Sequence, residues 1–186
     1  MAEPTRPLRI APVPPAERSG QIRELLDHAR VGTGPDANIF TTLVRAPGLY
    51  RRWLPFGSKL LAGKLPPRDR ELLILRTGWN CRAEYEWAQH ARIALDCGLT
   101  TEDIRRVVLD PATAGWAPFD GTLLRAADEL HLSSTVTDRT WSELADRYDT
   151  EQLIEVPMLV GHYHLVAMAL NTFGVELDDG LTGFPQ

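Results

Sequence analysis

Apolar residues recur every three or four positions along most of the chain, which is the spacing of α-helices that bury one face. No segment alternates apolar and polar residues as a half-buried strand would. The pattern therefore predicts an all-α fold, built as a single-domain helical bundle. The expected helices span residues 16–29, 39–45, 48–62, two segments within 66–98, 101–110, 118–132, 139–148 and 150–173.

Short polar residues stand at the expected starts of several helices. Asn38 and Asp138 each precede an apolar-periodic run, and Thr100 or Thr101 precedes another. Such side chains suit N-cap positions because their oxygens accept a hydrogen bond from a free backbone N–H of the first turn. Gly174 follows the last helix and suits its C-cap, where a left-handed backbone is common.

Proline and glycine divide the chain into parts. Five prolines within residues 1–20 exclude regular helix, so we expect an extended arm laid over the domain or over a neighbouring subunit. A helical domain then covers residues 21–175, and a short tail covers 176–186. Residues 32–36 (GTGPD) end the first helix. Pro55 interrupts a helical pattern, so a kink or two shorter helices are expected there.

The stretch from Pro66 to Gly98 predicts two consecutive buried helices that carry three inward ionisable side chains. At about 100° per residue, Glu71 falls on the apolar face of the first helix. Glu86 and His90, four residues apart, fall together on the apolar face of the second, where they are direct neighbours. The opposite arc of the second helix is expected to be its wetter side and holds Tyr85, Gln89, Arg92 and Asp96.

Buried ionisable groups are costly unless they are paired or used, which leaves three interpretations of this cluster. In the first, Glu86 and His90 form a hydrogen bond that only shapes the core. In the second, His90 transfers protons near neutral pH with carboxylates beside it. In the third, Glu71, Glu86 and His90 hold a metal, although Glu-x3-His departs from the Glu-x2-His spacing of carboxylate-bridged di-iron bundles. We favour proton transfer and expect neither a metal nor a cofactor.

Composition narrows the class of protein. The 186 residues are 44% hydrophobic and 24% charged, as in an ordinary soluble domain, and the formal net charge is −5. A negative chain has no electrostatic attraction to a phosphate backbone, so no nucleic-acid partner is expected. No apolar run approaches the roughly 20 residues of a membrane span, and no signal-peptide pattern opens the chain. We expect a cytoplasmic protein without a membrane partner.

The two cysteines, Cys81 and Cys97, are expected to be structural thiols. Along one helix their separation would be roughly 24 Å. A disulfide requires Cα atoms within about 7 Å, so the two cannot bridge within the chain.

The sequence of residues 66–101 resembles that of the carboxymuconolactone decarboxylase superfamily, which includes AhpD-like alkylhydroperoxidases. The resemblance extends more loosely over residues 38–174. The hydroperoxidase branch carries a Glu, a Cys-x-x-Cys pair and a His four residues after the second Cys. These positions fall on Glu71, Ala83, Glu86 and His90, so the redox dithiol is absent. The lactone decarboxylase branch is similar in its Glu-x3-His. The resemblance implies an all-helical homo-oligomer, a trimer or a hexamer, with sites near subunit contacts.

Together these features predict a cofactor-independent lyase or isomerase that acts on a small carbonyl acid or lactone. His90 would be the general acid/base, Glu86 would orient it and tune its charge, and Glu71 would relay protons or stabilise positive charge. Tyr85, Trp87, Cys81 and His162 are further candidates for the pocket. Two alternatives stay open. One is an alkylhydroperoxidase-like activity retained through Cys81, and the other is a non-catalytic, ligand-binding helical oligomer.

Overall fold

The computed structural model describes residues 6–29 and 36–185, and within these residues it is helical with no strand. The all-α prediction is therefore confirmed. The helices are α1 (Gly20–Asp27), α2 (Asn38–Leu43), α3 (Pro47–Leu61), α4 (Pro67–Asn80), α5 (Glu84–Asp96), α6 (Thr101–Arg106), α7 (Pro118–Ser133), α8 (Asp138–Ala145) and α9 (Thr150–Phe173), with a short 3-10 turn, η1 (Pro15–Glu17), in the arm.

The longest helix has the bounds that its sequence predicts. Asp149 caps α9, because its side chain accepts a hydrogen bond from the Gln152 backbone N–H. The Gln152 side-chain oxygen in turn accepts a hydrogen bond from the Asp149 backbone N–H. Gly174 ends the helix with a φ of 67°. A Cβ there would also lie 2.1 Å from the Pro7 carbonyl oxygen, so both the backbone and the packing of the arm require glycine.

Other boundaries differ from the sequence prediction. The first helix begins at Gly20, where Ser19 caps it, rather than near residue 16. Asn38 does not cap α2; it is the first helical residue, and its backbone N–H binds Asp178 of the tail. Thr137 rather than Asp138 caps α8. The predicted break over residues 32–36 falls largely outside the described residues.

Pro55 does not divide the helix into two pieces, because α3 runs unbroken from Pro47 to Leu61.

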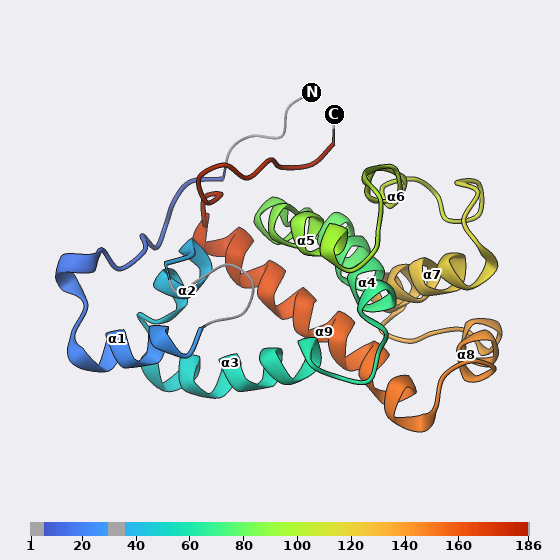
Figure 1. Ribbon diagram of the computed structural model, residues 1–186, viewed down its shortest axis with the longest axis horizontal. Coiled ribbons are helices and arrows are strands. Elements are labelled where there is room, and N and C mark those ends of the chain that lie inside the picture. Colours follow the sequence, from blue (N-terminus) through green and yellow to red (C-terminus); the bar gives the residue numbers. More distant parts are fainter. Residues whose placement is uncertain (1–5, 30–35, 186) are drawn as a thin grey trace.

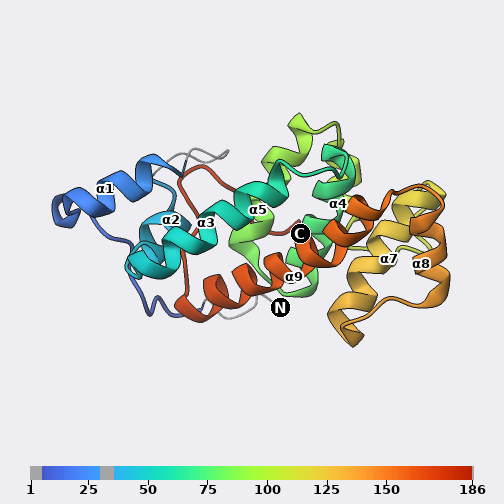
Figure 2. The same ribbon diagram turned by 90° about the horizontal axis from the view of Figure 1, so that it is seen from below.

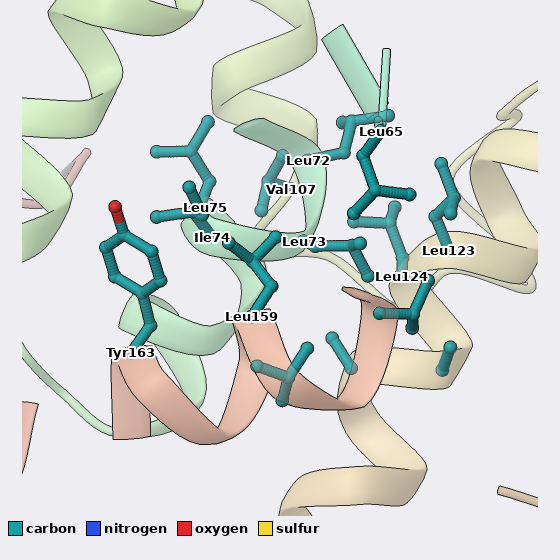
Figure 3. Close-up of a cluster of buried hydrophobic side chains, with 14 of the residues drawn as sticks. Leu65, Leu72, Leu73, Ile74, Leu75, Val107, Leu123, Leu124, Leu159 and Tyr163 are labelled. Atoms are coloured by element: carbon teal, nitrogen blue, oxygen red, sulfur yellow. The ribbon is translucent and has the colours of Figure 1, made fainter. Parts of the chain in front are cut away.

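Helix α4 is the centre of the molecule, because it packs against α5, α7 and α9. Figure 1 shows α9 crossing the middle of the fold, with α1 to α3 at one end and α7 and α8 at the other, and Figure 2 shows the same division from below. The main core lies where α4, α7 and α9 meet, and Figure 3 shows its leucine-rich contact. The side chains labelled there include Leu72, Leu73, Ile74, Leu75, Leu123, Leu124 and Leu159.

A second core joins the N-terminal arm to α1, α2 and α3. Val13 from the arm packs with Leu26, Phe40 and Tyr50. The Val13 backbone N–H also donates to the Thr41 carbonyl oxygen at 2.9 Å. The described part of the arm therefore lies over its own domain, one of the two placements that its prolines allow.

Helix α9 buries one side in the main core and in a smaller cluster with Tyr85, and it exposes large apolar side chains on another side. By length and composition alone α9 could cross a membrane, contrary to the expectation that no apolar run of this chain is long enough. Its most apolar window is 44% buried inside the protein, so core packing accounts for much of this composition. The large exposed apolar residues on this helix are Ile154, Met158, Leu165 and Met168.

Candidate active site

A cavity of about 90 Å³ lies between α3, α5 and α9 and is also lined by residues of α2. Its wall is mostly apolar and aromatic, with Glu86 and His90 from α5 and His162 and Tyr163 from α9 as the main polar groups. An engineered cavity of about 150 Å³ accepts benzene, so this space suits a ligand of about one ring or smaller. Among the described residues that line it there is no lysine or arginine.

His90 is held by a carboxylate on the neighbouring helix. Its Nδ1 lies 2.7 Å from Oε2 of Glu71, which is fully buried on α4. An ionised carboxylate can only accept, so Nδ1 carries the proton and Nε2 is the nitrogen that can exchange a proton with a ligand. The sequence left open whether these two residues meet, and the structure brings them together.

The Glu71 carboxylate stays ionised although it is buried. Burial alone would raise its pKa, but His90 and Arg70 together outweigh this and lower the pKa below its ordinary value. Arg70 donates from Nε to Oε1 of Glu71 at 3.0 Å, while His90 occupies Oε2. The two oxygens therefore form an ion-pair arrangement rather than the free ligand that the metal interpretation requires.

Glu86 is the unusual group of the cavity. Its side chain is 2% exposed, and neither carboxyl oxygen has a hydrogen-bond partner among the described residues. Burial raises its pKa well above the ordinary value, which favours the neutral carboxylic acid over the carboxylate. Gly78 of α4 makes room for it, since a Cβ there would lie 3.3 Å from Glu86 Oε1.

The predicted pairing within α5 differs from the observed one. Glu86 and His90 share one wall of the cavity, but His90 bonds to Glu71 instead. Spacing on one helix places two side chains on the same face, yet it does not decide which neighbour each one meets when a second helix crosses that face. The orienting role predicted for Glu86 therefore belongs, by geometry, to Glu71.

Aromatic residues close the side of the cavity formed by α3 and α9. His162 stacks on Trp53 with ring centroids 6.1 Å apart, and Phe56 meets it edge-on. Burial, together with the electrostatic influence of nearby His90, lowers the His162 pKa to about 4, so this ring is neutral at pH 7. Tyr163 packs edge-on against His90 at 4.9 Å. Sequence reasoning missed Tyr163 because α9 is apolar on nearly every face.

Tyr85 and Gln89 correct the prediction that their arc of α5 faces water, because both are buried. The tail covers them. The Tyr85 hydroxyl donates to Asp178 Oδ2 at 2.7 Å, and the Gln89 amide also donates to Asp178. The backbone N–H of Ile39 donates to the Tyr85 hydroxyl at 3.2 Å. Tyr85 and Gln89 both line the cavity, so the tail holds two residues of the cavity wall.

Two of the predicted pocket residues lie elsewhere. Trp87 is a core residue that packs with Trp79 and Phe184. Cys81 is the C-cap of α4 and is not part of the cavity lining. Its Sγ lies 3.9 Å from Nδ1 of His131, and burial raises its pKa to about 12. Both this thiol and that of Cys97 are free, as expected from their spacing.

The arginines of α4 are paired with carboxylates. Arg68 forms a two-pronged ion pair with Asp120, and Arg76 is buried beside Asp128. With Arg70 bound to Glu71, none of the three lines the cavity. A substrate carboxylate would therefore meet no guanidinium group there.

The arrangement provides a proton donor and a proton acceptor in one small, mostly apolar cavity. Glu86 can give a proton, and His90 can take one at Nε2 while ionised Glu71 stabilises the resulting imidazolium. Neither group needs a metal or an organic cofactor for this exchange.

Comparison with known proteins agrees with this fold. The Carboxymuconolactone decarboxylase family model matches residues 47–129, which include Glu71, Glu86 and His90. No curated protein sequence matches the chain. The chain is similar to the crystal structure of an alkylhydroperoxidase AhpD core, an uncharacterised peroxidase-related protein from Ralstonia eutropha JMP134. That match has a TM-score of 0.80 and 20% identity, over 96% of this chain and 95% of the other.

Two further structures share the fold. One is a putative antioxidant defence protein AhpD of unknown function from Agrobacterium tumefaciens, with a TM-score of 0.68 and 14% identity over 73% of this chain and 95% of that one. The other is a cysteine-to-alanine variant of the debrominase Bmp8 in complex with 2,3,4-tribromopyrrole. Its TM-score is 0.72, with 15% identity over 91% of each chain.

Proposed function

We propose that this chain, which belongs to the carboxymuconolactone decarboxylase family, is a cofactor-independent acid/base enzyme acting on a small unsaturated lactone. The observation that carries the proposal is the pairing of a neutral carboxylic acid, Glu86, with the Glu71-held His90 on one cavity wall. A carboxyl group without a hydrogen-bond partner is costly to bury, and such groups are concentrated at functional sites. This burial therefore favours a role for Glu86 in proton transfer.

The proposed reaction moves protons only. His90 Nε2 takes a proton from the carbon beside the lactone carbonyl, while Glu86 gives its proton to the carbonyl oxygen. The product of this step is a conjugated enol. His90 then returns its proton to the far end of the enol as Glu86 recovers the hydroxyl proton, so the double bond shifts and both groups regain their first state.

The absence of a cation from the described lining favours a lactone over a carboxylic acid as the substrate. A buried carboxylate without a counter-charge is strongly disfavoured. This consideration places the isomerase version of the prediction ahead of the decarboxylating lyase, whose substrate must bring a carboxylate into the cavity. The debrominase of the same fold binds a small planar ring, which agrees with a ring-sized ligand here.

The thiol-dependent peroxidase has less support from the geometry. Cys81 lies outside the cavity, and the family's two cysteine positions are held by Ala83 and Glu86. A homo-oligomer remains part of the proposal.

Deuterium incorporation tests the chemistry without knowledge of the final product. Small unsaturated lactones are incubated with the protein in deuterated water, and NMR follows exchange at the carbon beside the carbonyl. We expect exchange with wild type and its loss in His90→Gln and Glu86→Gln. The exposed His28→Gln and Glu102→Gln serve as matched controls and should behave as wild type. Equal exchange in all five proteins would overturn the proposal.

A further inference from the structure

Three potential metal ligands from separate parts of the sequence meet outside the cavity. Cys81 ends α4, His131 lies in the last turn of α7, and His164 lies in the middle of α9. Nδ1 of His131 is 2.8 Å from Nε2 of His164 and 3.9 Å from the Cys81 sulfur, and the three ligand atoms lie within 4.8 Å of one another. We propose that this trio is a zinc site.

The ligand set fits zinc. A thiolate and two imidazoles leave a fourth position for water, and Zn²⁺ prefers nitrogen and sulfur ligands in a tetrahedron. With bonds of about 2.3 Å to sulfur and about 2.0–2.1 Å to nitrogen, such ligand atoms are roughly 3.3–3.6 Å apart. The two observed separations, 2.8 and 3.9 Å, lie on either side of this value. Shifts of about half an ångström or less by exposed His131 bring these two separations to it, while the third, between Cys81 Sγ and His164 Nε2, is within 4.8 Å.

Two of the three ligands are already oriented by other groups. His164 donates from Nδ1 to the Val160 carbonyl oxygen at 2.8 Å, so its Nε2 presents a lone pair to the trio. Histidines that bind metals are commonly held in this way. Asn171 donates from Nδ2 to the carbonyl oxygen of Cys81 at 2.9 Å and fixes the backbone of the thiol.

Metal binding requires a change in the tautomer of His131 and the loss of the thiol proton of Cys81. Without metal, His131 donates its Nδ1 proton to Nε2 of His164, since His164 Nδ1 is already a donor. When Zn²⁺ binds, His131 takes the tautomer protonated at Nε2, and Cys81 releases its thiol proton to solvent. The site then carries one net positive charge, and the Asp128 carboxylate interacts electrostatically with His131.

Such an ion would tie the turn between α4 and α5 to α7 and α9. Arg82, the residue after Cys81, has a φ of 51°, an uncommon backbone conformation for a residue with a side chain. The first turn of α5 follows at once and carries Glu86. Zinc would therefore brace the segment that leads into the cavity wall, whichever reaction the cavity supports.

Zinc titration of the full-length protein, after treatment with a chelator, tests the site. We expect one Zn²⁺ per chain and a melting temperature that rises with zinc. Loss of a residue that only hydrogen-bonds to a metal ligand typically lowers metal affinity by about 10–100-fold. Cys81→Ser, His131→Gln and His164→Gln each remove a ligand itself, so each should lower zinc affinity by more than this. Cys97→Ser and His28→Gln remove the same chemical groups elsewhere and should bind as wild type.

Cobalt(II) provides a second readout, because a thiolate ligand gives it a charge-transfer absorption in the near ultraviolet. That band should appear in wild type and be lost in Cys81→Ser. The exposed His131→Gln keeps the test valid if the more buried variants misfold. Failure of wild type to bind zinc, or equal affinity in wild type and His131→Gln, would overturn the proposal. Neither result bears on proton transfer in the cavity.

Discussion

His90 donates a hydrogen bond through Nδ1 to Oε2 of Glu71, a residue nineteen positions earlier on the neighbouring helix, at 2.7 Å. Arg70 holds the other oxygen of the same carboxylate. This chain of contacts fixes the tautomer and the ring orientation of His90 and supplies a negative charge beside it. The three residues therefore form one unit in which only the imidazole reaches the cavity.

The first prediction concerns this unit. His90→Gln removes the proton acceptor and should lower kcat for lactone exchange by about 10²–10⁴, the usual contribution of a general acid or base. Glu71→Gln keeps the shape but removes the charge that stabilises the imidazolium, so a smaller loss in kcat is expected with KM nearly unchanged. NMR-detected exchange over a range of lactone concentrations measures kcat and KM for both variants.

Glu102→Gln is the matched control for Glu71→Gln, because Glu102 is exposed on α6. If Glu71→Gln retained full kcat, the carboxylate would only support the fold, and its contribution would appear in the free energy of unfolding alone.

The second prediction is that Glu86→Gln makes the protein more stable at neutral pH while it abolishes exchange. The folded-state pKa of Glu86 lies well above its ordinary value of 4.5. Above pH 4.5 the unfolded chain therefore releases this proton while the folded chain keeps it, so this group lowers the free energy of unfolding as pH rises. The slope is about 1.4 kcal/mol per pH unit up to the folded pKa.

Glutamine has no such proton, so the stability advantage of Glu86→Gln over wild type should grow as pH rises above 4.5 towards the folded-state pKa of Glu86. Urea unfolding at four or five pH values measures it. A difference that stays constant with pH would mean that Glu86 is ionised in the folded protein. Glu102→Gln should show no trend.

Much of this molecule was predictable because its helices are long and strongly periodic. The bounds of α9 were predicted from Thr150 to Phe173, and the inward positions of Glu71, Glu86 and His90 follow from a 3.6-residue period. The partner of His90 was not predictable. Which residues meet between two packed helices depends on the crossing angle and the relative offset of the helices. The pattern of apolar residues in the sequence determines neither quantity.

Irregular segments account for the other errors. Tyr85 and Gln89 lie on an arc that looks polar, but both bind Asp178 of the tail, and Tyr85 also packs against Val166 and Leu170 of α9. The tail, residues 176–186, has no periodicity from which its course could be inferred. The aromatic wall was missed for a related reason, since a helix that is apolar all round gives no preferred face for Tyr163.

The third prediction concerns the tail. Asp178 accepts hydrogen bonds from the Tyr85 hydroxyl, the Gln89 amide and the Asn38 backbone N–H. Asp178→Ala leaves these donors without their acceptor and should lower the free energy of unfolding by about 1–3 kcal/mol. Its exposed neighbour offers a matched control, because Asp179→Ala should change stability by less than about 0.5 kcal/mol. Equal stabilities of the two variants would show that the tail does not hold the cavity wall.

The fourth prediction concerns the exposed face of α9. Ile154, Met158, Leu165 and Met168 follow one another at spacings of four, seven and three residues, which places them on one side of the helix. Burying such side chains releases about 1.5–3 kcal/mol each, so a second copy of the chain is the occupant we expect. Light scattering should report a homo-oligomer for wild type and a smaller species for Leu165→Glu, in which a charge would be buried at the contact.

Leu109→Glu is the control, because Leu109 is similarly exposed but follows α6. A monomeric wild type, or a Leu165→Glu variant of wild-type mass, would place the contact between copies elsewhere or remove it.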